Sequence, residues 1–336
     1  MKRLLITFLK IAISVAIIGL LVWNATRGHQ NAFTELRTKP KDWSMLAAAW
    51  GCCTAATLLT FVRWWYLVRA LGIPCRFVDG IRISFWGYLL NLAPLGGIVA
   101  GDLVKAVMLD REHRGYRARA VASVLVDRIL GLYVLFVVAT AGILLTGFWR
   151  IGDPWIWWVS KLTFAVTIAF TIAMFMLLGP DYSNGRITQM FGRIPRVGPP
   201  LESLINAVRM YRESPVVLAV SSLATVGVHS LFAICCWLIA CGLPGNQPSL
   251  GYHFVLMPLA SAMGVIPLAM GPLEAALDFL YAHVPLVGTT IVPGRGLVIG
   301  LTYRLITVLV APLGSYYYFR NRRELSEVIH EAEQNP

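Results

Sequence analysis

Six charged side chains interrupt stretches of this chain that are otherwise apolar, and these residues are the most able to do chemistry. Each Asp, Glu, Lys or Arg near the centre of a bilayer costs roughly 2.5 to 3.5 kcal/mol, so such charges persist where they pair or meet a polar ligand. Arginine offers a planar fork of donors that fits a carboxylate or a phosphate. Two interpretations of these charges therefore remain open: they form ion pairs with one another, or they bind an anion. The six residues are Asp102, Asp127, Arg128, Glu274, Asp278 and Arg304.

The signs and spacing of these charges predict their partners. Asp102 is followed along the chain by Arg128, and Glu274 is followed at a similar interval by Arg304, which suggests one carboxylate–arginine pair in each half. Asp127 is adjacent to Arg128 in the sequence. Neighbours on a helix point about 100° apart, because one turn holds 3.6 residues, so these two side chains should face different partners.

The sequence shows no motif for a metal centre or for covalent catalysis. His229, His253 and His283 lack the short spacings of metal ligands, and no phosphate-binding loop, dinucleotide fingerprint or nucleophile elbow is present. The six cysteines lie mostly in apolar stretches, where they pack as small apolar side chains. We therefore predict no metal, no cofactor and no enzymatic activity.

Composition places these charges in a helical membrane protein. Hydrophobic residues make up 57% of the chain and charged residues 14%, a balance that excludes a soluble enzyme. Apolar runs long enough to cross a bilayer predict an all-α polytopic fold with about six transmembrane helices. These runs are residues 4–23, 45–62, 121–147, 156–178, 215–242 and 297–319.

Two more apolar segments are broken by proline and glycine, "NLAPLGGIVAGDLVKAVML" at 91–109 and "MGVIPLAMGPLEAALDFL" at 263–280. In hydrocarbon a broken helix is tolerated only where it is buried in protein or lines a polar cavity. Two such segments in corresponding halves point to a transporter-like binding site, although single glycines also fit close helix packing. The predicted hairpin-turn residues are Pro94, Gly96, Gly97, Gly101, Pro267, Gly271 and Pro272.

The basic residues are distributed asymmetrically, and this asymmetry predicts the topology. Of the 29 Lys and Arg, 20 fall at the N-terminus and in residues 63–82, 105–119, 179–214 and 320–323. By the positive-inside rule we expect a multi-pass protein of the plasma (inner) membrane with both termini in the cytoplasm. The net charge of +12 then faces anionic lipids, and we predict no nucleic-acid partner.

The same charge map orients the two broken segments and divides the chain. Residues 83–109 should re-enter from the cytoplasm and residues 253–283 from outside, which makes two oppositely oriented re-entrant hairpins in an inverted repeat. We expect a single membrane domain over 1–336. Its parts are a first helix and outer loop (1–43), repeat 1 (44–178), a cytoplasmic amphipathic linker (179–214), repeat 2 (215–319) and a cytoplasmic tail (320–336).

Several of these motifs together resemble a known family. A hairpin with Asn91, Pro94, Gly96, Gly97, Gly101 and Asp102 is followed by "ASVLVDRILGL" at 122–132, a proline–glycine–glutamate hairpin and "TYRLITVLVAPLG" at 302–314. The combination resembles the lysylphosphatidylglycerol synthase transmembrane-region family, also called flippase-like. The chain departs from the family pattern at Pro272, and we expect it to lack the aminoacyl-transferase domain and with it the synthase activity.

The resemblance implies movement of a lipid between membrane leaflets. The lipid would be an anionic or amphiphilic phospholipid or a polyprenyl-linked lipid. Headgroup-binding residues would be Arg128, Arg304 and Asn91, and gating or proton-coupling residues would be Asp102, Glu274, Asp278 and Asp127. Two alternatives stay open: an integral-membrane enzyme acting on a lipid phosphate, and a non-transporting scaffold. Membrane lipids are the expected partners, with a homodimer and a separately encoded lipid-modifying enzyme as further options.

Overall fold

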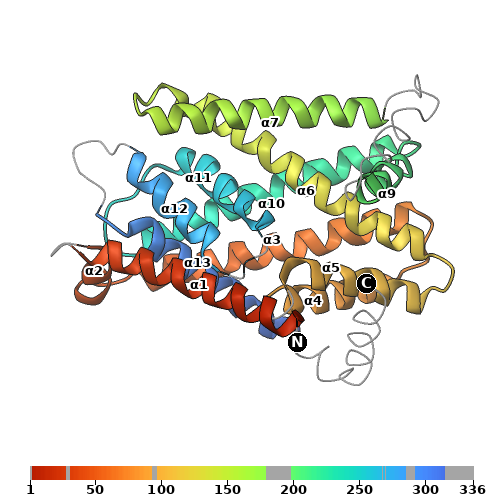
Figure 1. Ribbon diagram of the computed structural model, residues 1–336, viewed down its shortest axis with the longest axis horizontal. Helices are drawn as coiled ribbons and strands as arrows, with labels where there is room; N and C mark the ends of the chain where they lie inside the picture. The colour runs from red at the N-terminus through yellow and green to blue at the C-terminus, as the bar shows by residue number, and fades with distance from the viewer. Residues whose placement is uncertain are drawn as a thin grey trace.

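The computed structural model describes residues 2–27, 31–92, 97–178, 198–266, 268, 270–284 and 292–314, without the side chains of 2–7, 97–100, 198–201, 203 and 204. These residues fold into helices, with no β-strand among them (Figure 1). Six helices are long and apolar enough to cross a membrane, which confirms the predicted all-α polytopic class. They are α1 (Lys2–Thr26), α3 (Trp43–Ala70), α6 (Arg117–Thr146), α7 (Pro154–Leu178), α10 (Pro215–Gly242) and α13 (Arg295–Val310), the last extended by the 3-10 turn η3 (Ala311–Gly314).

The remaining helices are shorter, and four of them form two pairs. These are α4 (Phe77–Leu92) with α5 (Gly97–Glu112), here called hairpin 1, and α11 (Leu250–Ala262) with α12 (Pro272–His283), here called hairpin 2. At 1.5 Å per residue none of the four exceeds about 24 Å, less than the roughly 30 Å hydrocarbon core. The others are α2 (Ala32–Thr38), η1 (Phe148–Arg150), α9 (Gly198–Arg209) and η2 (Met263–Val265).

Local sequence signals explain where the long helices begin and end. The Asp42 carboxylate accepts hydrogen bonds from the backbone N–H groups of Ser44 (2.9 Å) and Met45 (3.3 Å), and so caps the start of α3. At the end of α6, Gly147 adopts φ +67°, a left-handed conformation that glycine accepts without steric cost. Helix α10 begins with Pro215, whose missing N–H would have no partner in the first turn.

Helices α3 and α10 form an antiparallel central pair that defines the two ends of the bundle. At one end the Asp42 N–H donates to the Gly242 carbonyl at 2.9 Å, so α3 begins where α10 finishes. At the other end the Tyr211 hydroxyl, just before α10, donates to the Leu67 carbonyl at 2.9 Å. We call the end where α3 finishes and α6 and α10 begin the arginine-rich end, because it carries Arg111, Arg114, Arg117 and Arg119.

Hairpin 1 opens at the arginine-rich end. The Arg82 guanidinium near the start of α4 pairs with the Glu112 carboxylate at the end of α5, 2.5 Å apart. The Arg119 guanidinium at the start of α6 donates to the Leu71 carbonyl, directly after α3, at 3.2 Å. The chain therefore leaves α3, travels inward along α4, and returns along α5 to the same end.

Hairpin 2 opens at the opposite end. The Tyr281 hydroxyl near the end of α12 lies 2.6 Å from Nε2 of His253 near the start of α11. The Arg295 guanidinium at the start of α13 donates to the Ala240 carbonyl near the end of α10 at 2.7 Å. The two hairpins thus open at opposite ends of the bundle, toward the two ends of its long axis in Figure 1.

The turn of hairpin 2 lies within the length of the bundle. Gly271 in that turn packs against Ile17 in the middle of α1, whereas Gly294 at the start of α13 packs against Ala25 near the end of α1. Eight residues of helix separate these contacts, or about 12 Å at 1.5 Å per residue. An element that penetrates this far and turns back has the geometry of a re-entrant segment, and its re-entry into a membrane stays a prediction.

Several boundaries differ from those expected. The helices of hairpin 1 span 77–112 rather than 83–109, and those of hairpin 2 begin at 250 rather than 253. Helix α3 continues to Ala70, beyond the span expected at 45–62, because its last two turns pack on α6 and the chain after α9. Pro94, Gly96 and Pro267 lie outside the described residues.

The linker expected to be amphipathic contains α9, whose described apolar side chains contact protein. Val208 and the following Tyr211 are buried against Leu67 of α3 and Val126 of α6. Because that burial occupies the described apolar positions, this part of the linker functions as a packed helix of the bundle.

Candidate functional site

The arginine predicted in repeat 1 forms a two-point ion pair with its carboxylate. Arg128 Nε donates to Asp102 Oδ2 at 2.6 Å, and Arg128 Nη2 donates to Asp102 Oδ1 at 2.7 Å. Parallel hydrogen bonds of this kind fix the planes of both groups. The Arg128 side chain is 47% exposed and that of Asp102 only 16%, so the guanidinium presents a free edge outward from the seam between α5 and α6.

The corresponding pair in repeat 2 is more enclosed. Arg304 Nε donates to Glu274 Oε1 at 3.1 Å, and the other carboxylate oxygen of Glu274 accepts the Gly271 N–H at 2.8 Å. The Glu274 side chain is fully buried, while that of Arg304 is 28% exposed. Glu274 therefore closes the turn of hairpin 2 in addition to neutralising the arginine.

Glycines let the helices approach closely enough for these pairs to form. A Cβ on Gly101 would collide with the Gly87 carbonyl and with Asn91, so α4 and α5 cross with almost no side chain between them. Asn91 Oδ1 accepts the Gly101 N–H at 3.1 Å. Asn91 thus ties α4 to α5 directly, and its role in headgroup binding stays a prediction.

Asp127 faces a different partner from its neighbour Arg128. The Arg63 guanidinium pairs with the Asp127 carboxylate at 2.9 Å and donates from Nη1 to the Thr225 hydroxyl at 2.7 Å. Both charged side chains are buried. This pair joins α3, α6 and α10 at the centre of the bundle, where an ion pair holds three helices in register.

Lys105 on α5 is buried beside the same charges. Its ammonium lies 5.0 Å from the ring centroid of Trp64, a cation–π distance. Within the described ranges no carboxylate lies within 4.0 Å of it. The two guanidinium groups of Arg63 and Arg128 are matched by the carboxylates of Asp127 and Asp102, so Lys105 is the one basic side chain of this described cluster without a carboxylate at ion-pair distance.

Asp278 makes a structural contact. Its Oδ1 accepts the Leu297 N–H at 3.0 Å, which satisfies a donor in the first turn of α13. A Cβ on Gly296 would collide with the Leu277 carbonyl and with Asp278, so the absence of a side chain at Gly296 permits this approach. The predicted gating or proton-coupling role of Asp278 stays a prediction.

Sequence reasoning missed the basic residues of the central cluster. The charge map counts Arg63 and Lys105 with the basic residues of the expected cytoplasmic segments 63–82 and 105–119, because each is the first residue of its segment. The structure buries both. The position of Arg63 within α3 could have indicated its burial. Arg63 lies two turns before the end of that helix, at the level in the bundle where Asp127 needs a partner.

In the part of the chain that the structure describes, no group of three His, Cys, Asp or Glu side chains is arranged to hold a metal ion. The charged groups of this site are the guanidinium groups of Arg128 and Arg304, each paired with a carboxylate. A phosphate oxygen would contact a guanidinium in the same geometry as a carboxylate oxygen does. The arrangement suits recognition of an anion.

The fold and these pairs define a polytopic helical membrane protein with two opposed hairpins. The chain belongs to the family described as the lysylphosphatidylglycerol synthase TM region, which it matches over residues 8–314. This match confirms the resemblance seen in the hairpin and arginine motifs, and it indicates a function related to membrane lipids. No curated protein matches the chain.

Proposed function

We propose that this protein moves an anionic or amphiphilic lipid, either a phospholipid or a polyprenyl-linked lipid, between the two leaflets of the membrane. The observation that carries the proposal is the pairing of Arg128 with Asp102 and of Arg304 with Glu274 across hairpins that open at opposite ends. A headgroup needs a polar contact on the way through hydrocarbon, and each half of the bundle supplies one.

The chemistry of the transfer is an exchange of anions. A lipid phosphate approaching the exposed edge of Arg128 offers the same oxygen geometry as Asp102, so the guanidinium can keep one hydrogen bond to each during the exchange. Arg304 offers a second, less exposed guanidinium, and the acyl chains would remain in lipid.

The topology of this proposal follows the charge map. We place the arginine-rich end in the cytoplasm, both termini on that side, and the protein in the plasma membrane, because basic residues gather on cytoplasmic flanks. Hairpin 1 then re-enters from the cytoplasm and hairpin 2 from outside. The proposal is one of transport without catalysis, and membrane lipids are the partners that it requires.

Leaflet exchange in proteoliposomes tests the proposed function. Vesicles containing a fluorescent phosphatidylglycerol are made with and without the purified protein, and a membrane-impermeant reductant then destroys the label in the outer leaflet. We expect the protein to increase the fraction of label that becomes accessible, and Arg128→Ala to abolish the increase. An equal accessible fraction with and without protein would contradict transport. Chemical conversion of the labelled lipid would instead favour an enzyme.

A further inference from the structure

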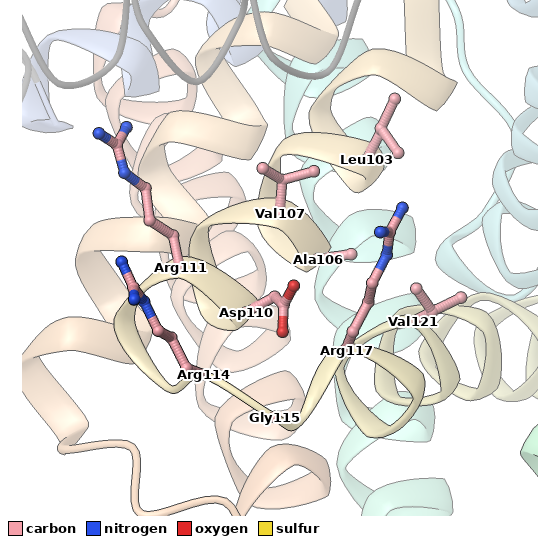
Figure 2. A pocket seen from close by; sticks show the side chains of 9 residues that line it. All are labelled: Leu103, Ala106, Val107, Asp110, Arg111, Arg114, Gly115, Arg117 and Val121. Atoms are coloured by element: carbon pink, nitrogen blue, oxygen red, sulfur yellow. The ribbon is translucent and has the colours of Figure 1, made fainter. Parts of the chain in front are cut away.

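A separate pocket lies at the arginine-rich end, between the last turns of α5, the following loop and the first turns of α6. Its volume is about 340 Å³. Figure 2 shows the side chains that surround it, with Asp110 between Arg111 and Arg114 on one side and Arg117 on the other. Three guanidinium groups and one carboxylate give the lining a net positive charge.

Two of the arginines that line this pocket, Arg114 and Arg117, are available to a ligand. Among the described residues, no carboxylate lies within 4.0 Å of the guanidinium of Arg114 or Arg117, and both side chains are exposed. Arginines that line one pocket without a matching number of carboxylates are suited to the several oxygens of a phosphate.

Part of the pocket lining is apolar. It is formed by Leu103, Val107 and Val121, and Val121 is 39% exposed. A ligand that fills the pocket therefore contacts both charged and apolar side chains. This combination matches the boundary between a phosphate headgroup and its acyl chains, whereas a free phosphate would leave the apolar wall without a partner.

The pocket leads toward the Arg128 pair along one seam. Leu103 directly follows Asp102 on α5, and Val121 precedes Arg128 by seven residues on α6, or about 10 Å at 1.5 Å per residue. On α6 the nearest pocket arginine, Arg117, precedes Arg128 by 11 residues, or about three helical turns.

We infer that this pocket binds the phosphate headgroup of an anionic phospholipid from the leaflet at the arginine-rich end. The inference deepens the proposed function, on which it rests for the later step, by naming the place where the headgroup binds before it reaches Arg128. Arg114 and Arg117 contact the phosphate, and the wall formed by Leu103, Val107 and Val121 contacts the first part of the acyl chains.

Calorimetric binding to the purified full chain in neutral detergent tests the inference without any transport. The probes are dihexanoyl phosphatidylglycerol, dihexanoyl phosphatidylcholine and inorganic phosphate. The Arg114→Gln/Arg117→Gln double variant removes two pocket charges. The control, Arg69→Gln/Arg76→Gln, removes two exposed charges at the same end outside the pocket. Elution volume and thermal stability verify the fold of each variant.

We expect phosphatidylglycerol binding to weaken roughly tenfold or more in the pocket variant and to change less than about twofold in the control. Phosphatidylcholine should bind more weakly than phosphatidylglycerol to the unmodified protein. Equal losses in both variants would overturn the site, and phosphate binding as tight as that of the short-chain lipid would overturn the assignment to a lipid.

The two proposals fail in different ways. Pocket-dependent lipid binding in a protein that shows no leaflet exchange would contradict the transport function and leave the binding site standing. Normal exchange with unchanged lipid binding in the Arg114→Gln/Arg117→Gln variant would contradict the binding site alone.

Discussion

Arg128 holds Asp102 through two hydrogen bonds of 2.6 and 2.7 Å while almost half of its own side chain remains exposed. The corresponding Arg304 makes one hydrogen bond of 3.1 Å to a fully buried Glu274 that also binds the Gly271 backbone. Each repeat therefore contains an arginine–carboxylate pair, but the two pairs differ in exposure and in the number of hydrogen bonds. The Arg128 pair can accept a competing anion at its exposed edge, whereas opening the Arg304 pair disturbs the turn of hairpin 2.

Replacing Arg128 by lysine should separate a role in lipid binding from a role in protein stability. Lysine keeps the charge and loses the planar fork, so we expect Arg128→Lys to slow anionic lipid exchange about tenfold in proteoliposomes. Thermal stability in detergent should change little, because the pair is partly exposed. Arg69→Lys provides the control at an exposed site on α3. Normal exchange by Arg128→Lys would assign the arginine a purely structural role.

The buried pair of Arg63 and Asp127 should matter mainly for stability. Removing one partner leaves an uncompensated charge in the interior, so Asp127→Asn should lower the free energy of unfolding by about 3 to 5 kcal/mol. Asp102→Asn, at the more exposed pair, should lower it by about 1 kcal/mol or less. Reversible unfolding in mixed detergent micelles measures both.

A double variant examines the cause of that difference. Arg63→Met combined with Asp127→Leu removes both charges at once, and it should recover most of the stability lost by Asp127→Asn. If the double variant is as unstable as Asp127→Asn, the loss arises from packing rather than from an unpaired charge.

The helical class, the six spans and the partners of Arg128 and Arg304 were predictable from the sequence, because each has a local or repeated signal. The length of an apolar run predicts a membrane-spanning helix, and a charged residue inside such a run predicts a partner of opposite charge. Arg63 and Lys105 were missed because their neighbours in sequence are basic while their neighbours in space are Asp127 and Trp64. Sequence distance alone carries no record of such packing.

The hydrogen bond that Asp278 makes to α13 was also not predictable from the sequence. Its carboxylate accepts the Leu297 N–H from the following helix, and this contact depends on the close approach that Gly296 allows. A charge in an apolar segment and a cap supplied by a neighbouring helix look the same in the sequence.

Cys75, in the loop between α3 and α4, should be nearly inert to thiol reagents. Burial, followed by the nearby Asp79 and Glu112 carboxylates, raises the pKa of its thiol to about 11, so little thiolate exists at pH 8. In the unfolded chain the Cys75 thiol ionises near pH 9. The contribution of this thiol to the free energy of unfolding should therefore fall as pH rises from about 9 to 11. A variant with Cys75 as the sole cysteine tests this.

Maleimide labelling of that variant over pH 7 to 11 provides the measurement. Labelling should be slow below pH 9 and should accelerate toward pH 11, with full labelling in denaturant at any pH in the range. Rapid labelling of the folded protein at pH 7.5 would show that the thiol is accessible and ionised.

The orientation of the hairpins can be tested at their open ends. Arg111→Cys lies at the end of α5 and His283→Cys at the end of α12, so the two cysteines should react with impermeant reagents from opposite sides of the membrane. Cells and inverted vesicles expressing variants that lack the native cysteines give the two readings. Labelling of both positions from the same side would eliminate the inverted arrangement.

We expect Glu274 to couple lipid exchange to a proton gradient. A carboxylate that binds a proton would release Arg304 and allow the site to return empty, because the charge that holds the guanidinium disappears. Glu274→Gln imitates the protonated state and keeps an oxygen that can accept the Gly271 N–H of the hairpin 2 turn, so it should retain the fold and lipid binding while exchange loses its dependence on a pH gradient. Asp278→Asn is the matched control, since asparagine keeps the oxygen that caps α13. A gradient-dependent rate in Glu274→Gln, or a gradient-independent rate in the unmodified protein, would exclude Glu274 as the proton carrier.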